Sequence, residues 1–279
     1  MTYLRDDLKQ VWQGQDIHEL LTRLDGVEYR KLEARRTFRF EINGQGFFAK
    51  VHHGIGWGEI IDNLIRGRKP VLGADNEWQA LNRLHELGID TMTPVAFDKK
   101  GLNPAQQHSY LVTEELKNMT SLEDVCKHWN NNPPPLPLKR AFIKKLATIS
   151  RQLHDHGINH RDYYLCHFLM PNTLLTTDGQ LRQDCSPDDL RFYLIDLHRA
   201  QLRETTPERW RIKDLSGLYY SAMECGLNHH DLLRFIRIYT QQPLKKTLAQ
   251  NADFWQKVAR KAEKLYVRMD RKLQQRSDK

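Results

Sequence analysis

Four charged side chains, placed far apart along the chain, are of the types that phosphoryl transfer requires. Lys50 and Glu77 come from the first third of the sequence, and Asp162 and Asp196 come from its second half. One carboxylate can orient an attacking hydroxyl group and accept its proton, while another can hold the metal ion of a nucleoside triphosphate. A lysine held by an acid can neutralise phosphate oxygens. We therefore predict Asp162 as the catalytic residue, Asp196 as a metal ligand, and Lys50 and Glu77 as nucleotide-binding residues.

The neighbours of these residues resemble the motifs of the protein-kinase-like superfamily. His160-Arg161-Asp162 resembles the catalytic His-Arg-Asp motif, and Asp196-Leu197-His198 resembles the metal-binding Asp-Phe-Gly motif. Ala49-Lys50 resembles the end of the strand that carries the phosphate-binding lysine. Residues 113–116 lie where the hinge of a kinase reads adenine. The resemblance extends roughly from residue 27 to the helices that follow residue 214.

This resemblance implies cofactors and further roles. ATP and Mg²⁺ are the expected cofactors. Glu114 and Leu116 are expected to read adenine through backbone groups, and His160 and Asp214 are expected to support the catalytic loop. Only 18 positions separate Asp196 from Asp214. So short a segment leaves little room for docking a peptide, which favours a small molecule or a glycolipid as acceptor.

The sequence departs from the superfamily pattern where the phosphates are usually held. The glycine-rich G-x-G-x-x-G segment is absent, and residues 33–37, predicted as a loop between the first two strands, contain no glycine. Either backbone amides approach the phosphates there, or Arg35 and Arg36 supply positive charge instead. We therefore include Arg35 and Arg36 among the expected nucleotide-binding residues.

A second departure concerns the expected metal site. His167 stands five residues after Asp162, where the superfamily has an asparagine ligand. Imidazole matches hard Mg²⁺ less well than an amide carbonyl does. His167 therefore either ligates the metal with Asp196, contacts phosphate, or only supports Asp162. His198 replaces the glycine of Asp-Phe-Gly and restricts the backbone there.

Several longer strings resemble one family within this superfamily, the lipopolysaccharide core heptose(I) kinases. The strings are residues 71–78, 159–162, 166–169, 195–201, 209–211, 213–215 and 261–264. The resemblance implies ATP-dependent phosphorylation of the first heptose of the lipopolysaccharide inner core, at its 4-hydroxyl. It implies a lipid A–Kdo–heptose acceptor and action at the cytoplasmic face of the inner membrane of a Gram-negative bacterium.

The pattern of apolar and turn residues predicts a β-rich first half and a helical second half. Strands are expected at residues 27–32, 38–42, 47–51, 109–113 and 192–195, and helices at residues 75–87, 138–154, 215–223 and 231–239. Asn43-Gly44 between two of the strands is a strong hairpin signal. We predict an α+β, bilobal protein-kinase-like fold, with a nucleotide-binding lobe at residues 1–116 and a helical lobe at residues 117–279, and a small-molecule site in the cleft between lobes. The Asn- and Pro-rich residues 130–137 are the strongest boundary signal and predict an extended connector.

Composition excludes several classes of protein. The chain has 279 residues, of which 39% are hydrophobic, too many for a disordered chain. No stretch approaches the roughly 18 apolar residues of a membrane span, and the first residues do not resemble a secretory signal. The four cysteines form no CxxC pair, so reduced thiols and no zinc site are expected. We expect a cytoplasmic protein.

The net charge of +8 is concentrated at one end of the chain. Residues 241–279 hold 11 basic and 4 acidic residues. Within them Phe254, Val258, Ala262, Leu265, Met269 and Leu273 recur at helical spacing. Such a basic amphipathic helix either meets an anionic surface, or packs on the domain with a solvated outer face. The anionic surface would be the inner membrane or an acidic protein such as acyl carrier protein.

Other functions remain open at this point. One alternative is a kinase of another inner-core sugar such as Kdo, and another is a tyrosine-directed protein kinase. A third is a pseudokinase-like binding module whose basic tail holds nucleic acid. No nucleic-acid signature accompanies the basic tail, so nucleic acid is not an expected partner.

Overall fold

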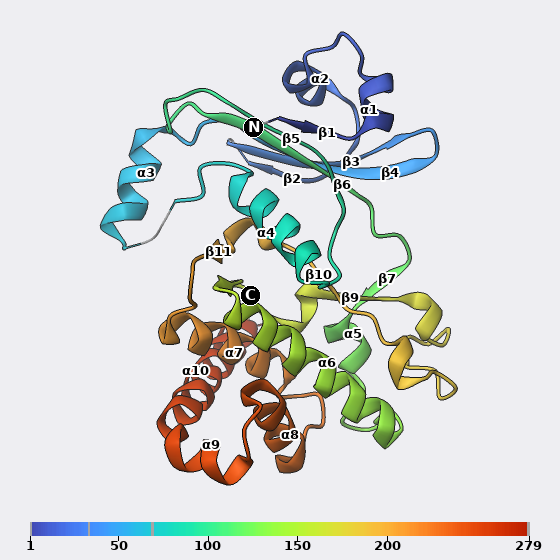
Figure 1. The fold of residues 1–279 in the computed structure, drawn as a ribbon, viewed down its shortest axis with the longest axis vertical. Coiled ribbons are helices and arrows are strands. Elements are labelled where there is room, and N and C mark those ends of the chain that lie inside the picture. Colours follow the sequence, from blue (N-terminus) through green and yellow to red (C-terminus); the bar gives the residue numbers. More distant parts are fainter. Residues whose placement is uncertain (1, 33, 68–69, 278–279) are drawn as a thin grey trace. The chain divides into compact units, whose positions relative to one another are not determined.

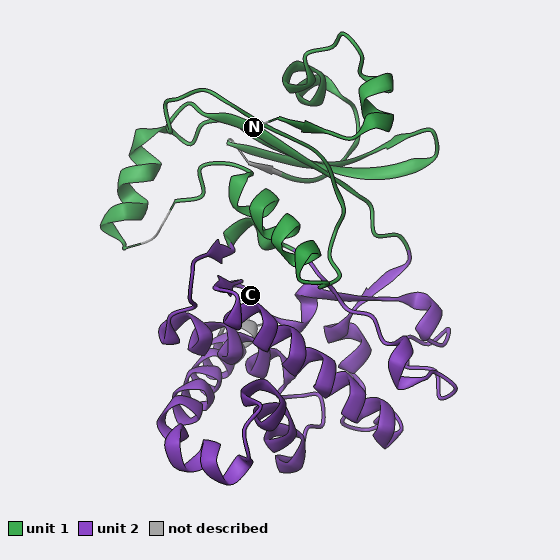
Figure 2. Ribbon diagram, in the orientation of Figure 1, with its two compact units in different colours: residues 1–117, 196–199 green, residues 118–195, 200–279 purple. Residues whose placement is uncertain are grey.

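The computed structural model describes residues 2–32, 34–67 and 70–277, and of residues 31, 32 and 272–277 it describes the backbone alone. The chain forms two compact units (Figure 2). Unit 1 comprises residues 1–117 and 196–199, and unit 2 comprises residues 118–195 and 200–279. The segment 196–199 therefore belongs to unit 1, although the chain on both sides of it belongs to unit 2.

Unit 1 is built on a six-stranded antiparallel sheet with the strand order β1-β5-β6-β4-β3-β2 (Figure 1). The strands are β1 (Tyr3–Leu4), β2 (Val27–Leu32), β3 (Arg35–Ile42), β4 (Gln45–His52), β5 (Pro94–Lys100) and β6 (His108–Glu114). The turn residues Asn43 and Gly44 have φ angles of 51° and 78°. Two positive φ angles are typical of the type I′ turn, which fits the twist of paired strands. The predicted hairpin is confirmed.

The predicted loop over residues 33–37 is wrong for residues 35–37, whereas residue 34 does lie in a turn. β3 begins at Arg35, and the ladder pairs Arg35 with His52, Arg36 with Val51 and Thr37 with Lys50. The sheet therefore extends to the end of β4, because the partner strand offers hydrogen bonds along its whole length. Residue 33 lies outside the described residues.

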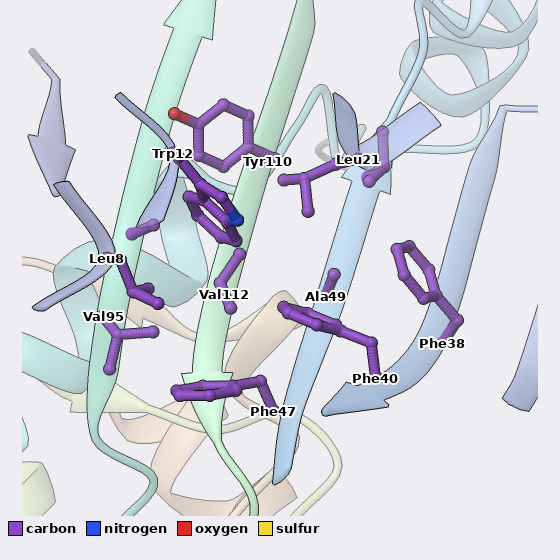
Figure 3. Packing of buried hydrophobic residues seen from close by; sticks show 12 residues of the cluster. Leu8, Trp12, Leu21, Phe38, Phe40, Phe47, Ala49, Val95, Tyr110 and Val112 are labelled. Carbon is purple, nitrogen blue, oxygen red and sulfur yellow. The ribbon is translucent and has the colours of Figure 1, made fainter. Parts of the chain in front are cut away.

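The core of unit 1 lies on one face of this sheet. Leu8 and Trp12, from and just after α1 (Asp6–Val11), and Leu21, from α2 (Ile17–Arg23), pack on Phe38, Phe40, Phe47, Ala49, Val95, Tyr110 and Val112 (Figure 3). Successive side chains of a strand point to opposite faces. Lys50 therefore lies on the face opposite to Ala49.

α4 (Asp75–Glu86) packs against that opposite face. Its Trp78 ring is stacked on Phe97 of β5, with 4.8 Å between the ring centroids. The helix ends one residue before the predicted end, and Gly88 follows with a φ angle of 68°. The predicted helix over residues 75–87 is thus confirmed, and it covers the same face as Lys50.

α3 (Gly56–Ile65) is unusual because it leaves apolar side chains exposed. Trp57, Ile61, Leu64 and Ile65 are between 51% and 80% exposed. Their spacing places them on one face of the helix. Ile60 is buried and attaches the helix to unit 1.

Unit 2 is mainly helical, with two small antiparallel sheets of order β10-β9-β7 and β11-β8. Its strands are β7 (Met119–Ser121), β8 (Ile158–Asn159), β9 (Phe168–Pro171), β10 (Tyr193–Leu194) and β11 (Gln201–Leu202). Its α-helices are α5 (Leu122–Cys126), α6 (Leu136–Asp155), α7 (Glu208–Ala222), α8 (His229–Thr240), α9 (Leu244–Gln250) and α10 (Ala252–Ser277). The described residues also form four single-turn helices: η1 (Leu165–His167), η2 (Asn172–Leu174) and η3 (Pro187–Asp189) in unit 2, and η4 (Leu197–Arg199) in unit 1.

Two predictions for this unit need correction. Residues 130–137 lie inside unit 2 and do not separate the units, and α6 already begins at Leu136 with a proline in its first turn. Proline is accepted there because the first N–H groups of a helix need no partner within it. The helix predicted at residues 215–223 begins earlier, because α7 starts at Glu208 directly after Pro207, and Asp214 therefore lies inside it.

The C-terminal helix packs on its own unit over part of its length. Val258 and Ala262 of α10 are buried, and the Ser216 hydroxyl of α7 donates to the carbonyl of Val258 at 3.1 Å. Tyr266 and Met269, farther along, are exposed. Of the predicted apolar stripe, Val258 and Ala262 are thus buried, Phe254 and Leu265 are half-buried and Met269 is exposed, while the side chain of Leu273 lies outside the described residues. No helix among the described residues is long and apolar enough to cross a membrane.

Candidate active site

Lys50 and Glu77 form an ion pair in unit 1. The Lys50 Nζ lies 2.6 Å from the Glu77 Oε1, and the Glu77 side chain is 1% exposed. Lys50 comes from β4, and Glu77 comes from the first turn of α4. A carboxylate so deeply buried is expensive to leave unpaired, so it fixes the position of the ammonium group. The second oxygen, Oε2, has no hydrogen-bond partner among the described residues.

Asp196 lies close to the same lysine. Its Oδ1 is 3.9 Å from the Lys50 Nζ, and the side chain is 34% exposed. The His198 Nδ1 donates to this Oδ1 at 2.5 Å. Asp196 has a φ angle of 62°, a left-handed conformation that aspartate adopts more readily than most residues. Unit 1 thus presents a fixed ammonium group beside an accessible carboxylate, which is suited to phosphate oxygens and their metal ion.

The two arginines of β3 lie on opposite faces of the sheet, because they are adjacent in a strand. Arg35 faces the site: burial and the charge of Arg30 lower its pKa, and the charges of Asp196 and Glu77 oppose that shift. It therefore joins the cluster around Lys50.

Arg36 is held elsewhere. Its Nε donates to Glu28 at 3.0 Å, and its Nη1 donates to the backbone carbonyls of Leu21 and Thr22. Its guanidinium also lies 4.0 Å from the centroid of the Phe38 ring, on the side of the hydrophobic core. Arg36 thus ties α2 to the sheet and does not join the Lys50 cluster.

The expected adenine-reading segment, residues 113–116, spans the end of β6 and the two residues after it. The Glu114 carboxylate accepts a hydrogen bond from Arg5 at 2.6 Å, and the Glu114 N–H donates to the Thr93 carbonyl at 2.9 Å. The side chain of Glu114 is therefore structural. No hydrogen bond of the Leu116 N–H or carbonyl is found within the described part of the chain.

In unit 2 the loop that carries Asp162 is braced by a buried acid. The N–H groups of His160 and Arg161 donate to the two carboxylate oxygens of Asp214, at 2.7 and 2.8 Å. Asp214 is 1% exposed. Arg161 has a φ angle of 74°, which is strained for a residue with a long side chain. The paired hydrogen bonds hold the backbone in this conformation, and Asp162 follows directly.

Two stacked histidine rings hold the same loop from the other side. The His167 Nδ1 donates to the backbone carbonyl of Asp162 at 2.6 Å, and the His160 Nε2 donates to the backbone carbonyl of Ile195 at 2.9 Å. The ring centroids are 5.7 Å apart. The Ile195 N–H in turn donates to the His167 carbonyl at 2.9 Å. The residue before Asp196 is thus bound to the Asp162 loop by two hydrogen bonds.

The geometry favours one of the three roles considered for His167, the support of Asp162. With a proton on Nδ1, a neutral ring carries its lone pair on Nε2, so only Nε2 can act as a ligand. Within the described residues no group of three or more His, Cys, Asp and Glu side chains is arranged to hold a metal ion. Mg²⁺ bound here would rely on phosphate oxygens and water in addition to protein carboxylate.

A comparison with protein families matches residues 19–239 to the lipopolysaccharide kinase (Kdo/WaaP) family. The chain belongs to this family. Two relatives are named lipopolysaccharide core heptose(I) kinase WaaP: that of Pseudomonas aeruginosa is 49% identical over 96% of this chain and 97% of its own, and that of Escherichia coli K12 is 44% identical over 98% and 99%. A solved structure, "WaaP in complex with acyl carrier protein", is 43% identical, covers 95% of this chain and 99% of that chain, and has a TM-score of 0.80.

Membership in the Kdo/WaaP family makes the protein a kinase, and a kinase family implies the use of ATP. The α+β fold predicted from the sequence is confirmed by the antiparallel sheet of unit 1, the helices of unit 2 and the likeness to the solved WaaP structure. The predicted family is likewise confirmed.

One residue near the site, His52, was not predicted from the sequence. His52 lies on the same face of β4 as Lys50, two residues farther along, and it is 4% exposed. Burial, followed by the charges of Arg35 and Lys50, lowers the pKa of His52 to about 3, so the ring is neutral. Residues two apart in a strand lie on the same face, so the sequence spacing of Lys50 and His52 would have indicated that the two side chains are neighbours.

Proposed function

We propose that the protein transfers a phosphoryl group from ATP to the first heptose of the lipopolysaccharide inner core, at the 4-hydroxyl. The observation that carries this proposal is the Asp162 loop, fixed by the paired hydrogen bonds of Asp214, in a chain that also fixes Lys50 on Glu77. The sugar is proposed from the relatives, which are named heptose(I) kinases at 44% to 49% identity.

In this proposal Asp162 orients the heptose hydroxyl and accepts its proton as the oxygen attacks the terminal phosphorus. General-base catalysis of this kind contributes about 10²- to 10⁴-fold to a rate. Lys50, kept in place by Glu77, stabilises the phosphate oxygens on which negative charge develops. Arg35 adds a second positive charge to the nucleotide phosphates, in place of the absent glycine-rich segment.

Asp196 is the carboxylate that we propose for Mg²⁺. Its accessible side chain beside Lys50 fits the way proteins bind this ion, through one or two carboxylates together with phosphates and water. When bound, the ion supplies charge stabilisation to the phosphates. His198 orients the carboxylate, and His167 holds the Asp162 backbone, with its Nε2 as the one atom through which it could reach the metal.

The adenine ring is proposed to bind at the segment that follows β6. Leu116 offers a backbone N–H and a backbone carbonyl that make no hydrogen bond within the described residues. A purine edge presents one donor and one acceptor to such a pair. Glu114 contributes through its backbone carbonyl, since its N–H is bound to Thr93 and its side chain to Arg5.

The test replaces Asp162 with asparagine. With labelled ATP and a heptosylated Kdo–lipid A acceptor, the Asp162→Asn variant is expected to lose about 10²- to 10⁴-fold in kcat, because the amide cannot accept the proton. The matched control is Asp178→Asn, an exposed aspartate of unit 2, which is expected to keep wild-type kcat. Position-specific analysis of the product locates the label.

Three results would contradict the proposal. The first is an Asp162→Asn variant that keeps most of the activity. The second is label found on Kdo, with none on heptose. The third is label found on protein tyrosine alone.

We further propose that α10 binds an anionic partner. Its exposed cations include Arg260, Lys261, Lys264 and Arg268, while the buried Val258 attaches the helix to unit 2. Acyl carrier protein is the first partner that we propose, because the solved relative is titled as a complex with it. The cytoplasmic face of the inner membrane is the second surface, since the acceptor is a membrane lipid and anionic lipids attract clustered basic residues.

Replacing Arg260, Lys261, Lys264 and Arg268 together by glutamine tests this surface. At low salt we expect at least a tenfold loss of affinity for acyl carrier protein, for anionic vesicles, or for both, since exposed charges act most strongly when unscreened. The matched control removes four exposed cations elsewhere in unit 2, Lys127, Arg140, Lys144 and Lys246. Equal binding by wild type and both variants would refute the role of α10.

A further inference from the structure

Unit 1 contains a cavity of about 510 Å³ next to the Lys50 cluster. Its walls are the end of β2, the start of β3, the end of β4, the start of α3 and the turn of η4. The residues that matter here are Arg30, Arg35, His52, Glu59, His198 and Arg199. Lys50, Glu77 and Asp196 do not line it. The cavity therefore adjoins the proposed phosphate site without being identical with it, and Arg35 belongs to both.

The lining is strongly cationic. Three arginines face one carboxylate, that of Glu59, among the described lining residues. Burial, followed by the charge of Arg30, lowers the pKa of Arg35, while the charges of Asp196 and Glu77 oppose that shift. The Arg35 Nε is buried without a hydrogen-bond partner in the described structure. A buried N–H group without a partner is costly, and an anion bound in the cavity would offset that cost.

His52 is a second unpartnered polar group in the same wall. It is 4% exposed, and its Nε2 finds no hydrogen-bond partner among the described residues. It stands directly opposite Arg35 in the ladder between β3 and β4. A neutral imidazole between arginines adds no positive charge of its own and can still donate one N–H to an anion. Two orphaned polar groups, side by side on one sheet face, are what a ligand would satisfy.

We propose that this cavity binds an acidic group of the acceptor, a carboxylate or a phosphate, while the nucleotide phosphates occupy the Lys50 cluster. The proposal rests on the proposed function. Along a strand, His52 lies roughly 7 Å beyond Lys50. An acidic substituent close to the reacting sugar can span that separation. The inner core offers both chemistries, since Kdo carries a carboxylate and lipid A carries phosphates.

Arg30→Gln is the variant that tests the cavity, because Arg30 lies on the exposed strand β2 and outside the Lys50 cluster. We expect KM for the heptosylated acceptor to rise about tenfold, with kcat and KM for ATP unchanged, since a charge-assisted contact to the acceptor is lost. The dissociation constant of the acceptor, measured by calorimetry without ATP, should rise by the same factor. Arg23→Gln, an exposed arginine on α2, is the matched control and should change neither value.

Two modified acceptors identify the acidic group. One has its Kdo carboxylates methyl-esterified, and the other has its lipid A phosphates removed. If the cavity reads a carboxylate, the ester weakens binding to the wild type and abolishes the difference between wild type and Arg30→Gln. If the cavity binds a phosphate, the dephosphorylated acceptor binds the wild type more weakly and abolishes the difference between wild type and Arg30→Gln.

Two results would overturn the proposal. One is a rise in KM for ATP with unchanged acceptor binding, which would assign the cavity to the nucleotide. The other is a difference between wild type and Arg30→Gln that persists with both modified acceptors. A wild-type protein that binds the acceptor through Arg30 yet never phosphorylates heptose would refute the proposed function and leave the subsite standing.

Discussion

Asp214 is the residue on which the Asp162 loop depends. Its two oxygens accept from consecutive backbone N–H groups, of which the second belongs to Arg161 in its left-handed conformation. A backbone strained in this way persists only if the surrounding contacts hold it in that conformation. The carboxylate therefore acts on the position of Asp162 through the backbone and touches no substrate.

We predict that Asp214→Asn weakens both the fold and the reaction. Asparagine keeps one acceptor oxygen and puts an N–H₂ group where the second N–H needs an acceptor. The loss of a buried charged hydrogen bond should lower the free energy of unfolding by about 1.5–3 kcal/mol and reduce kcat. Urea denaturation and initial rates measure the two effects.

Asp189→Asn is the control for that prediction. Asp189 also accepts a backbone N–H, from Ser186 at 3.0 Å, but it is exposed at the surface of unit 2. Its replacement should cost less than about 1 kcal/mol and leave kcat unchanged. Equal losses in the two variants would mean that burial of Asp214 is not what matters.

At the scale of residues, the sequence indicated the pairing of Lys50 with Glu77 well, because the order of motifs carries it. It could not separate Arg35 from Arg36. That separation depends on where β3 begins, since a strand that starts at Arg35 sends the two side chains to opposite faces. The hydrogen bond from His167 to the Asp162 carbonyl was equally hidden, because it depends on the folded path of the loop.

Among the elements, α6 and α8 are joined by a buried ion pair. The Lys139 Nζ lies 2.8 Å from the Asp231 Oδ2, and both side chains are less than 10% exposed. Asp231 also accepts from the N–H of Asn228, which closes the capping box at the start of α8. Burial would raise the pKa of Asp231, but the hydrogen bonds from Lys139 and Asn228 outweigh it and hold the pKa below its usual 3.8.

This pair should make stability depend on pH in the acidic range. Because the pKa is depressed in the folded state, the stabilisation is complete above about 3.8 and is lost as the pH falls through the lower, folded value. Asp231→Asn should therefore cost about 1.5–3 kcal/mol in the free energy of unfolding at pH 6, and progressively less as the pH falls below 3.8. Urea denaturation of both proteins across this range measures it. A cost that stays constant with pH would show that the carboxylate charge contributes nothing.

Helices and strands that have regularly spaced apolar residues, or a turn residue at one end, were predicted from the sequence. The β3–β4 hairpin and α4 are examples, since Asn43-Gly44 and Gly88 mark their ends. The first half of α7 was missed, because it buries Asp214 in place of an apolar stripe and therefore has little amphipathic pattern. The proline-rich residues 130–137 were wrongly predicted to be extended throughout. A proline is accepted in the first turn of a helix, and α6 begins within this segment, at Leu136.

At the scale of the whole molecule, the two units are not continuous halves of the chain. Residues 196–199 belong to unit 1, although they lie between the two segments of unit 2, residues 118–195 and 200–279. A reading of the sequence from one end to the other predicts contiguous lobes, because local patterns carry no information on such a return. The family resemblance predicted more than the hydrophobic patterns did, because the members of a family share both fold and activity.

The charge of the whole molecule is also divided. The excess of +8 comes almost entirely from residues 241–279, so the rest of the chain is close to neutral. Its association with anions should therefore depend on α10 and on local clusters such as the cavity of unit 1.

The exposed apolar face of α3 affects the tryptophan fluorescence of the protein. Of the six tryptophans in the sequence, Trp57 is the one that is mainly exposed among the described residues, at 55%. An aqueous quencher such as iodide reaches it first, so the red edge of the emission spectrum belongs chiefly to α3. Because Gly56 and Glu59, on either side of Trp57 in the sequence, line the cavity, we expect that part of the spectrum to change when an anion binds in the cavity.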